Sequence, residues 1–102
     1  MRARLVLALA APLGLALACV TEARVEDRLD EANYCESADE CVEVYPDCPL
    51  GCVRLVNEAE VDDVQALIDR YHRQHRDNCA YDCVGLGPPR CEGGRCVADP
   101  AL

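Results

Sequence analysis

The 102-residue chain contains no Trp or Phe, and its 19 acidic and 10 basic residues give a formal net charge of −9 at pH 7. An aromatic-poor chain of this length can bury one small core at most. A surface this acidic argues against binding to nucleic acid and against attraction to anionic lipid.

Residues 1–18 are predicted to form a secretory signal that takes no part in the fold. Arg2 and Arg4 precede an uncharged run from residue 5 to residue 17, rich in Leu and Ala, and Cys19 follows shortly after it. At about 13 residues, this run is too short for a usual transmembrane span. We therefore expect an exported protein, located in the periplasm or at the outer membrane if it is anchored and secreted if it is not.

The stretch Ala16-Leu17-Ala18-Cys19 resembles the bacterial lipobox, in which the Cys thiol is acylated and the Cys becomes the new N-terminus. The lipobox prefers Leu three residues before the Cys and a small residue two before it, where this chain has Ala16 and Leu17. The resemblance implies a lipid anchor on Cys19 and, because Val20 rather than Asp follows, an outer-membrane location. An odd ninth cysteine fits this assignment. A cleaved, soluble protein with a free terminal thiol is the alternative.

Residues 19–34 are predicted to be a polar tether between the membrane and the domain. Most residues between Arg24 and Asn33 are charged, and Val25 and Leu29 are the only large apolar residues there. The acidic residues that follow are Glu36, Asp39, Glu40, Glu43 and Asp47. Because they do not form an Asp-x-Asp-x-Asp-Gly calcium loop, we expect a solvated acidic face.

Two alternating segments, 41–45 and 51–56, flank a turn-rich stretch and predict a first β-hairpin. The segment from Asn57 to Asp77 is predicted to be an amphipathic helix, because apolar residues recur there at three- and four-residue steps. Asn57 can cap its first turn, and Glu60 can complete a capping box. The expected core consists of Val42, Val44, Val53, Leu55, Val61, Val64, Ile68 and Tyr71.

A second hairpin is predicted at the C-terminal end, where Gly93-Gly94 forms a two-residue turn and places Cys91 opposite Cys96. Residues 99–102 are expected to be a short frayed tail. The domain therefore extends over residues 35–98. Its fold class is predicted to be α+β: a small disulfide-rich domain with one central amphipathic helix and two short β-hairpins.

Eight cysteines are predicted to form four disulfides: Cys35, Cys41, Cys48, Cys52, Cys79, Cys83, Cys91 and Cys96. The sequence does not determine their pairing. Our preferred arrangement joins the two Cys-x-x-x-Cys pairs, 48/52 and 79/83, across the helix, and leaves the other bridges among the remaining four. A local bridge between Cys91 and Cys96 is also compatible with the hairpin. Four bridges of about 2 to 4 kcal/mol each exceed what so thin a core can contribute, so we expect reduction to unfold the domain.

The cysteine spacing and the helix together resemble a group of bacterial proteins. The segments that carry the resemblance are Cys48-Pro-Leu-Gly-Cys52, Val56-Asn57 at the helix start, Cys79-x-x-x-Cys83 and Cys91-Glu-Gly-Gly-Arg-Cys96-Val97. They resemble uncharacterised small cysteine-rich secreted proteins and lipoproteins of high-GC Gram-negative bacteria. The resemblance implies the fold and an exported location, and because that group has no assigned function it implies no activity.

We predict no catalytic residue, no cofactor and no metal site. His72 is expected to be solvated, and His75 to end the apolar stripe of the helix. The expected role is that of a non-enzymatic, membrane-anchored lipoprotein of the cell envelope that interacts with a protein partner and not with nucleic acid.

Two alternative functions remain open. The first is a protease-inhibitor-like binder, in which the prolines before Arg90 hold that side chain out on an extended loop. The second is a thiol-disulfide redox protein that uses Cys79. The position of Cys79 after a helix C-terminus disfavours its thiolate, because the helix dipole is negative there.

Overall fold

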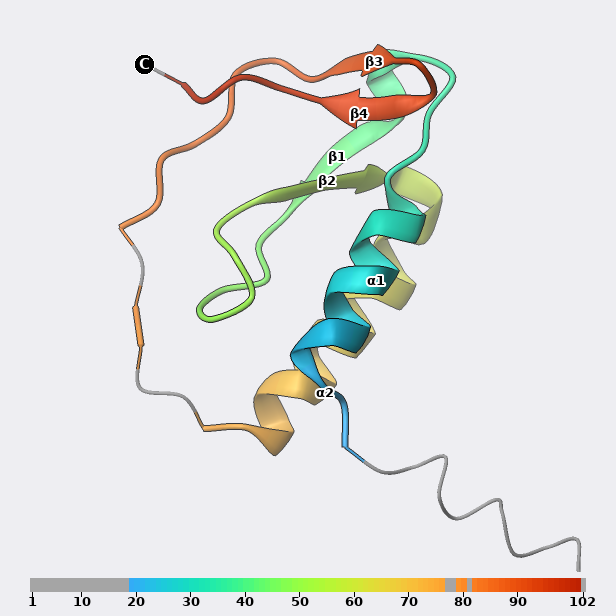
Figure 1. Ribbon diagram of the computed structural model, residues 1–102. Helices are drawn as coiled ribbons and strands as arrows, with labels where there is room; N and C mark the ends of the chain where they lie inside the picture. Colours follow the sequence, from blue (N-terminus) through green and yellow to red (C-terminus); the bar gives the residue numbers. More distant parts are fainter. Residues whose placement is uncertain (1–18, 77–78, 81, 102) are drawn as a thin grey trace, which may run out of the picture.

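The structure is a computed structural model, and it describes residues 19–76, 79–80 and 82–101 (Figure 1). The predicted signal segment, residues 1–18, lies outside the described residues. Helices and strands follow in the order α1 (Glu22–Ala32), β1 (Cys41–Val44), β2 (Arg54–Asn57), α2 (Val61–Gln74), β3 (Arg90–Glu92) and β4 (Arg95–Val97), with short 3₁₀ turns at Ala38–Glu40 and Glu58–Glu60. The predicted class, a small disulfide-rich α+β domain with two hairpins, is confirmed. The described part of the chain has two α-helices where one was expected.

Helix α1 replaces the solvated tether that we expected over residues 19–34. The Thr21 hydroxyl accepts a hydrogen bond from the Arg24 amide at 3.1 Å and caps the first turn. Val25, Leu29 and Ala32 lie at four- and three-residue steps, and none is more than 1% exposed. The prediction was wrong because one apolar residue per turn is enough to pack one face of a charged helix against a second helix beside it.

Helix α2 confirms the predicted amphipathic helix, with Val64, Ile68 and Tyr71 buried. It ends at Gln74, because the next residue is already extended. The predicted end at Asp77 lies outside the described residues. In Figure 1, α1 and α2 lie side by side, and contacts near both ends of α1 show that the two helices run antiparallel.

The start of α2 differs from the predicted capping box. Asn57 Oδ1 accepts a hydrogen bond from the Ala59 amide at 2.9 Å, as expected of a cap, but a 3₁₀ turn separates this cap from the helix. The Glu60 carboxylate does not turn back to the cap. It instead accepts hydrogen bonds from Arg28 at 2.5 Å and from the Tyr34 hydroxyl at 2.8 Å. Glu60 therefore joins α2 to α1.

Strands β1 and β2 are antiparallel, with Cys41 opposite Asn57 and Val44 opposite Arg54. Both faces of β2 are buried. Val56 packs in the main cluster with the helices, whereas Leu55 packs in a second cluster with buried half-cystines. The sequence pattern predicts that Leu55 lies in the core that faces the helix. That expectation was wrong because adjacent strand residues point to opposite faces, and here the second hairpin covers the other face.

The second hairpin has the predicted two-residue turn, and Gly93 and Gly94 have φ values of 59° and 79° that suit it. Cys91 lies opposite Cys96. In Figure 1 this hairpin, in red, lies beside the β1–β2 hairpin and away from the N-terminal end of α1. Residues 99–101 are not frayed as we expected. Pro100 pairs with Leu86, and the Ala101 amide donates to the Gly85 carbonyl at 2.8 Å.

The disulfides join segments that are far apart in the sequence. The four bridges are Cys35–Cys91, Cys41–Cys96, Cys48–Cys79 and Cys52–Cys83. The two Cys-x-x-x-Cys pairs are joined to each other, as in our preferred arrangement. The local bridge between Cys91 and Cys96 does not form, because both thiols of the hairpin turn to segment 35–41, with Cα–Cα distances of 5.9 and 5.8 Å.

Candidate functional site

Eight of the nine cysteines are in disulfides, and the ninth, Cys19, is free and exposed. Its neighbour Val20 is only 2% exposed and belongs to the main core cluster. The Val20 amide donates to Gln74 Oε1 at 2.6 Å, and the Val20 carbonyl accepts a hydrogen bond from His75 Nε2 at 2.8 Å. Within the described residues, packing into the core therefore begins at Val20, one residue after Cys19.

Gln74 and His75 hold the backbone of Val20, a role that the sequence did not reveal. The His75 ring stacks on Tyr71, with ring centroids 4.2 Å apart. That contact agrees with its predicted place at the end of the apolar stripe. Nothing in the sequence marks Gln74, because its partner lies 54 residues away.

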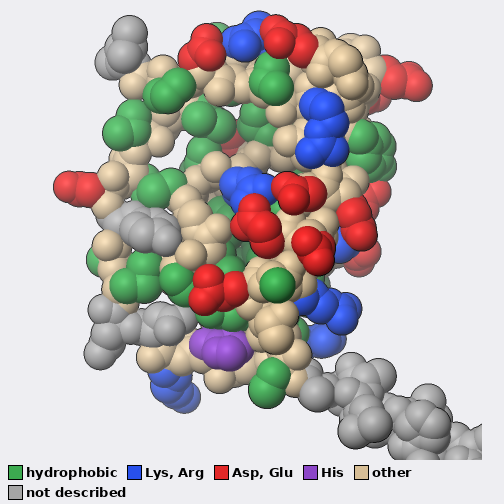
Figure 2. Space-filling model, viewed as in Figure 1, with side chains coloured by type: hydrophobic (Ala, Val, Ile, Leu, Met, Phe, Trp, Pro, Cys, Tyr) green, Lys and Arg blue, Asp and Glu red, His purple; other side chains and the backbone are tan. Residues whose placement is uncertain are grey.

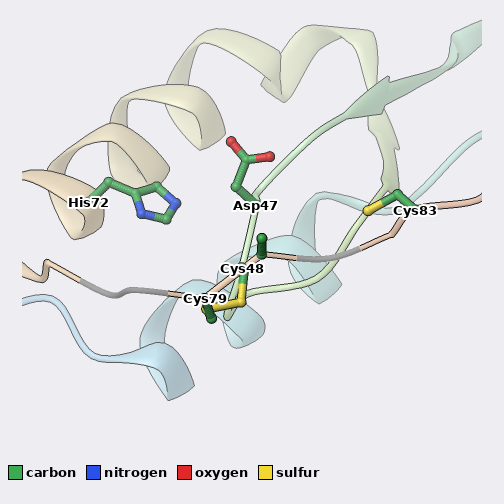
Figure 3. Close-up of a pocket in the computed structure, with 6 residues that line it drawn as sticks. Asp47, Cys48, His72, Cys79 and Cys83 are labelled. Atoms are coloured by element: carbon green, nitrogen blue, oxygen red, sulfur yellow. A yellow bond between two sulfur atoms is a disulfide. The ribbon is translucent and has the colours of Figure 1, made fainter.

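A hollow of about 410 Å³ lies between the end of α2 and the Cys48–Cys79 and Cys52–Cys83 bridges (Figure 3). Its lining residues are Asp47, Cys48, His72, Cys79, Ala80 and Cys83. His72 is half-buried rather than solvated as expected, and its Nε2 donates to the Pro46 carbonyl at 2.6 Å. The three cysteines of the lining are bridged, so they offer no thiolate nucleophile.

The residues of the redox alternative do not form a dithiol pair. Cys79 is bonded to Cys48 and Cys83 to Cys52, so neither is the partner of the other. These two bridges attach the chain after α2 to the loop between β1 and β2. The two bridges therefore have a structural role, because they hold these two loops together.

The Arg90 side chain does not extend freely from a loop, as the inhibitor alternative requires. Arg90 is the first residue of β3, and its guanidinium donates to Glu92 at 2.8 Å and to Asp99 at 3.3 Å. Both carboxylates belong to the same C-terminal segment. The guanidinium therefore stabilises the second hairpin and its following residues.

Among the described residues, one group of three side chains has the spacing of possible metal ligands: Cys35, Cys41 and Cys96. All three sulfurs are already bonded in two neighbouring disulfides. Metal binding by cysteine needs the thiolate, so this group acts as a pair of adjacent bridges. It joins the second hairpin to segment 35–41.

Ion pairs connect α1 to the elements packed beside it. Arg28 lies 2.5 Å from Glu60 and 3.4 Å from Asp63 on the α2 side, and Arg54 on β2 lies 2.6 Å from Glu26 and 3.0 Å from Asp30. Hydrogen bonds from Arg28 and then Tyr34 lower the pKa of Glu60 below its ordinary value. These contacts fix α1 in place and form no reactive centre.

No protein-family model matches the chain, and neither a curated protein nor a solved structure shows significant similarity to it. None of the helices in the described ranges is long and apolar enough to cross a membrane.

Proposed function

We propose that this protein is an exported lipoprotein that is anchored to a cell-envelope membrane through Cys19 and acts without catalysis, as a rigid interaction domain. The observation that carries the proposal is the state of its cysteines. Eight are consumed in four bridges, and the free, exposed one directly follows the secretory signal predicted from the sequence. A free thiol at that position is the acceptor that lipidation requires.

The anchoring chemistry uses Cys19 alone. Its thiol forms a thioether bond to the diacylglyceryl group of a phospholipid, and the phosphate headgroup leaves with the thiol proton. Hydrolysis of the bond before Cys19 then frees an α-amino group, which can take a further acyl chain from a phospholipid ester, leaving a lysophospholipid. Two acyl chains or more anchor a protein stably, whereas one gives only marginal binding.

The disulfides support an extracytoplasmic location. Four bridges in so small a domain indicate an oxidising environment outside the cytoplasm. They also make the domain rigid, which lowers the entropic cost of binding a partner.

An interaction role is supported by what the loops expose. Tyr45 is 56% exposed and Val84 is 61% exposed, and each lies on a loop that is held by the Cys48–Cys79 and Cys52–Cys83 bridges. Large apolar side chains on rigid loops are suitable contacts for a protein partner. The inhibitor and redox alternatives have less support, because Arg90 is ion-paired within its hairpin and Cys79 is bridged to a distant loop.

The proposal is tested by the intact mass of the full chain after expression in a Gram-negative host and extraction from its membranes. A lipid-sized increment that disappears in Cys19→Ser is expected, and Cys19→Ser should move to the soluble periplasmic fraction. The other eight cysteines should be alkylated only after reduction. An unlipidated protein, or a Cys19→Ser variant that is equally membrane-bound, would overturn the proposal.

A further inference from the structure

The arginines that follow Cys19 fall into two groups. Arg28, Arg54 and Arg90 form ion pairs, and Arg95 donates to the Asp30 carbonyl at 3.0 Å. The others are exposed and belong to no ion pair within the described part of the chain: Arg24, Arg70, Arg73 and Arg76. The first group supports the fold, and the second remains available to a partner.

The four available arginines lie at one end of the molecule. Because α1 and α2 are antiparallel, Arg24 in the first turn of α1 is at the same end as the arginines in and after the last turns of α2. We call residues 19–24 and 70–76 the basal surface. Figure 2 shows basic side chains at the lower end of the molecule, below the main group of acidic ones.

The charge of the basal surface is opposite to that of the whole chain. It contains four arginines and one acidic residue, Glu22, with Asp27, Asp47 and Asp69 at its border, whereas the whole chain after residue 18 carries 19 acidic residues and eight arginines. A charge summed over the sequence hides this separation. The expectation that the protein is repelled by anionic lipid therefore does not apply to this end.

Cys19 lies at the basal surface, and the next residue already belongs to the folded core. Val20 is buried, and both its amide and its carbonyl are hydrogen-bonded to the end of α2. Acyl chains on Cys19 would be one residue from the rigid core. The end of the domain that faces the bilayer is then set by the fold and not by a flexible linker.

A flat anionic surface suits this distribution better than an extended polyanion. The 14 residues of α2 rise about 21 Å, and electrostatic interactions are screened over roughly 8 to 10 Å at moderate salt. A bilayer would therefore meet the basal arginines while the acidic first turn of α2 stays beyond its field. A nucleic acid strand that ran along the molecule would pass the acidic surface as well.

We infer that the basal surface docks directly on anionic phospholipid headgroups, with its arginines on the lipid phosphates, so that the domain stands upright on the membrane. The inference rests on the proposed anchor at Cys19. It adds the orientation of the domain and the class of lipid that it contacts. The loops that expose Tyr45 and Val84 are then left accessible to a partner.

A single introduced tryptophan can report this contact, because the chain has none. Ala23→Trp places the probe on the basal surface, and Ala38→Trp places a matched probe on an exposed alanine in the 3₁₀ turn that follows the C-terminal end of α1. The lipid-bearing full chain is reconstituted into vesicles of brominated phosphatidylglycerol with phosphatidylethanolamine, or of brominated phosphatidylcholine. We expect roughly twofold stronger quenching of Ala23→Trp in the anionic vesicles. Ala38→Trp should be unquenched in both.

The charge dependence is tested in the Ala23→Trp background. Arg73→Gln with Arg76→Gln should reduce quenching in anionic vesicles to the level seen with phosphatidylcholine, and high salt should do the same. Arg90→Gln with Arg95→Gln removes equal charge from the other end and should leave the quenching unchanged.

Intact mass of each sample separates the two proposals. If the lipid is present but quenching is equal in both vesicle types, or is unaffected by the basal substitutions, the docking inference is overturned and the anchor stands. If no lipid is found, the anchor is overturned and the docking inference fails with it.

Discussion

The side-chain amide of Asn33 forms two hydrogen bonds with the backbone of Cys96. Asn33 Oδ1 accepts from the Cys96 amide at 2.6 Å, and Asn33 Nδ2 donates to the Cys96 carbonyl at 3.1 Å. The two residues are 63 positions apart. This contact ties the end of α1 to strand β4, next to the buried bridge between Cys41 and Cys96.

Replacing Asn33 by Asp should lower the free energy of unfolding by about 1 to 3 kcal/mol at neutral pH, because the Cys96 carbonyl loses its donor and meets a carboxylate. Urea unfolding measures the loss. The deficit should shrink in acid, where a protonated carboxyl can donate to that carbonyl. Glu31→Gln is the control, because Glu31 is an exposed residue of the same helix. A deficit that grows in acid would contradict this account.

Leu29→Ala tests whether α1 is part of the core. The Leu29 side chain is 1% exposed, so its truncation should cost about 2 to 5 kcal/mol of unfolding free energy. Asp27→Ala, on the exposed side of the same helix, should change it by less than about 0.5 kcal/mol. If residues 19–34 were a solvated tether, both variants would unfold at the wild-type urea concentration.

The Cys41–Cys96 and Cys48–Cys79 bridges should contribute differently to the free energy of unfolding. Because the neighbouring bridge stays intact in each variant, the removed bridge closes a loop of only about 10 to 13 residues. Replacing both Cys41 and Cys96 or both Cys48 and Cys79 by Ala therefore costs about 3 kcal/mol by the chain-entropy estimate. The first bridge is buried in the second core cluster, so its loss also removes packing. Thermal unfolding should therefore rank the Cys41/Cys96 variant as clearly less stable.

Full reduction should unfold the domain. Circular dichroism with and without reductant measures this, and alkylation of the eight half-cystines confirms that reduction is complete. A fully alkylated protein that keeps its native spectrum would show that the core is sufficient by itself.

Glu60 should make stability depend on pH on the acid side. Hydrogen bonds from Arg28 and then Tyr34 lower its folded-state pKa below the ordinary value of 4.5. The unfolded state therefore binds the proton more tightly, so the contribution is complete above that ordinary value and is lost as pH falls through the lowered pKa. The stability difference between wild type and Glu60→Gln should be largest near neutral pH and should close in acid.

Urea midpoints measured across this pH range test the prediction. Glu58→Gln, an exposed carboxylate of the same 3₁₀ turn, is the matched control. A difference for Glu60→Gln that stays constant from neutral to acid pH would mean that its carboxylate is not stabilised by the contacts to α1.

The sequence by itself determined α2 and both hairpins. Those features follow from local rules. Apolar residues at helical spacing define α2, and Gly93-Gly94 permits the positive φ values of a two-residue turn. Neither rule needs a distant partner.

The tertiary structure alone decided the burial of α1, the direction of Leu55, the pairing of the C-terminal residues and the attachment of Val20 to the end of α2. Each depends on a surface contributed by another part of the chain, such as Gln74, 54 residues from Val20. The distinction between paired and available arginines has the same origin. A charge acquires its role from the groups that folding brings beside it, and local sequence does not contain that information.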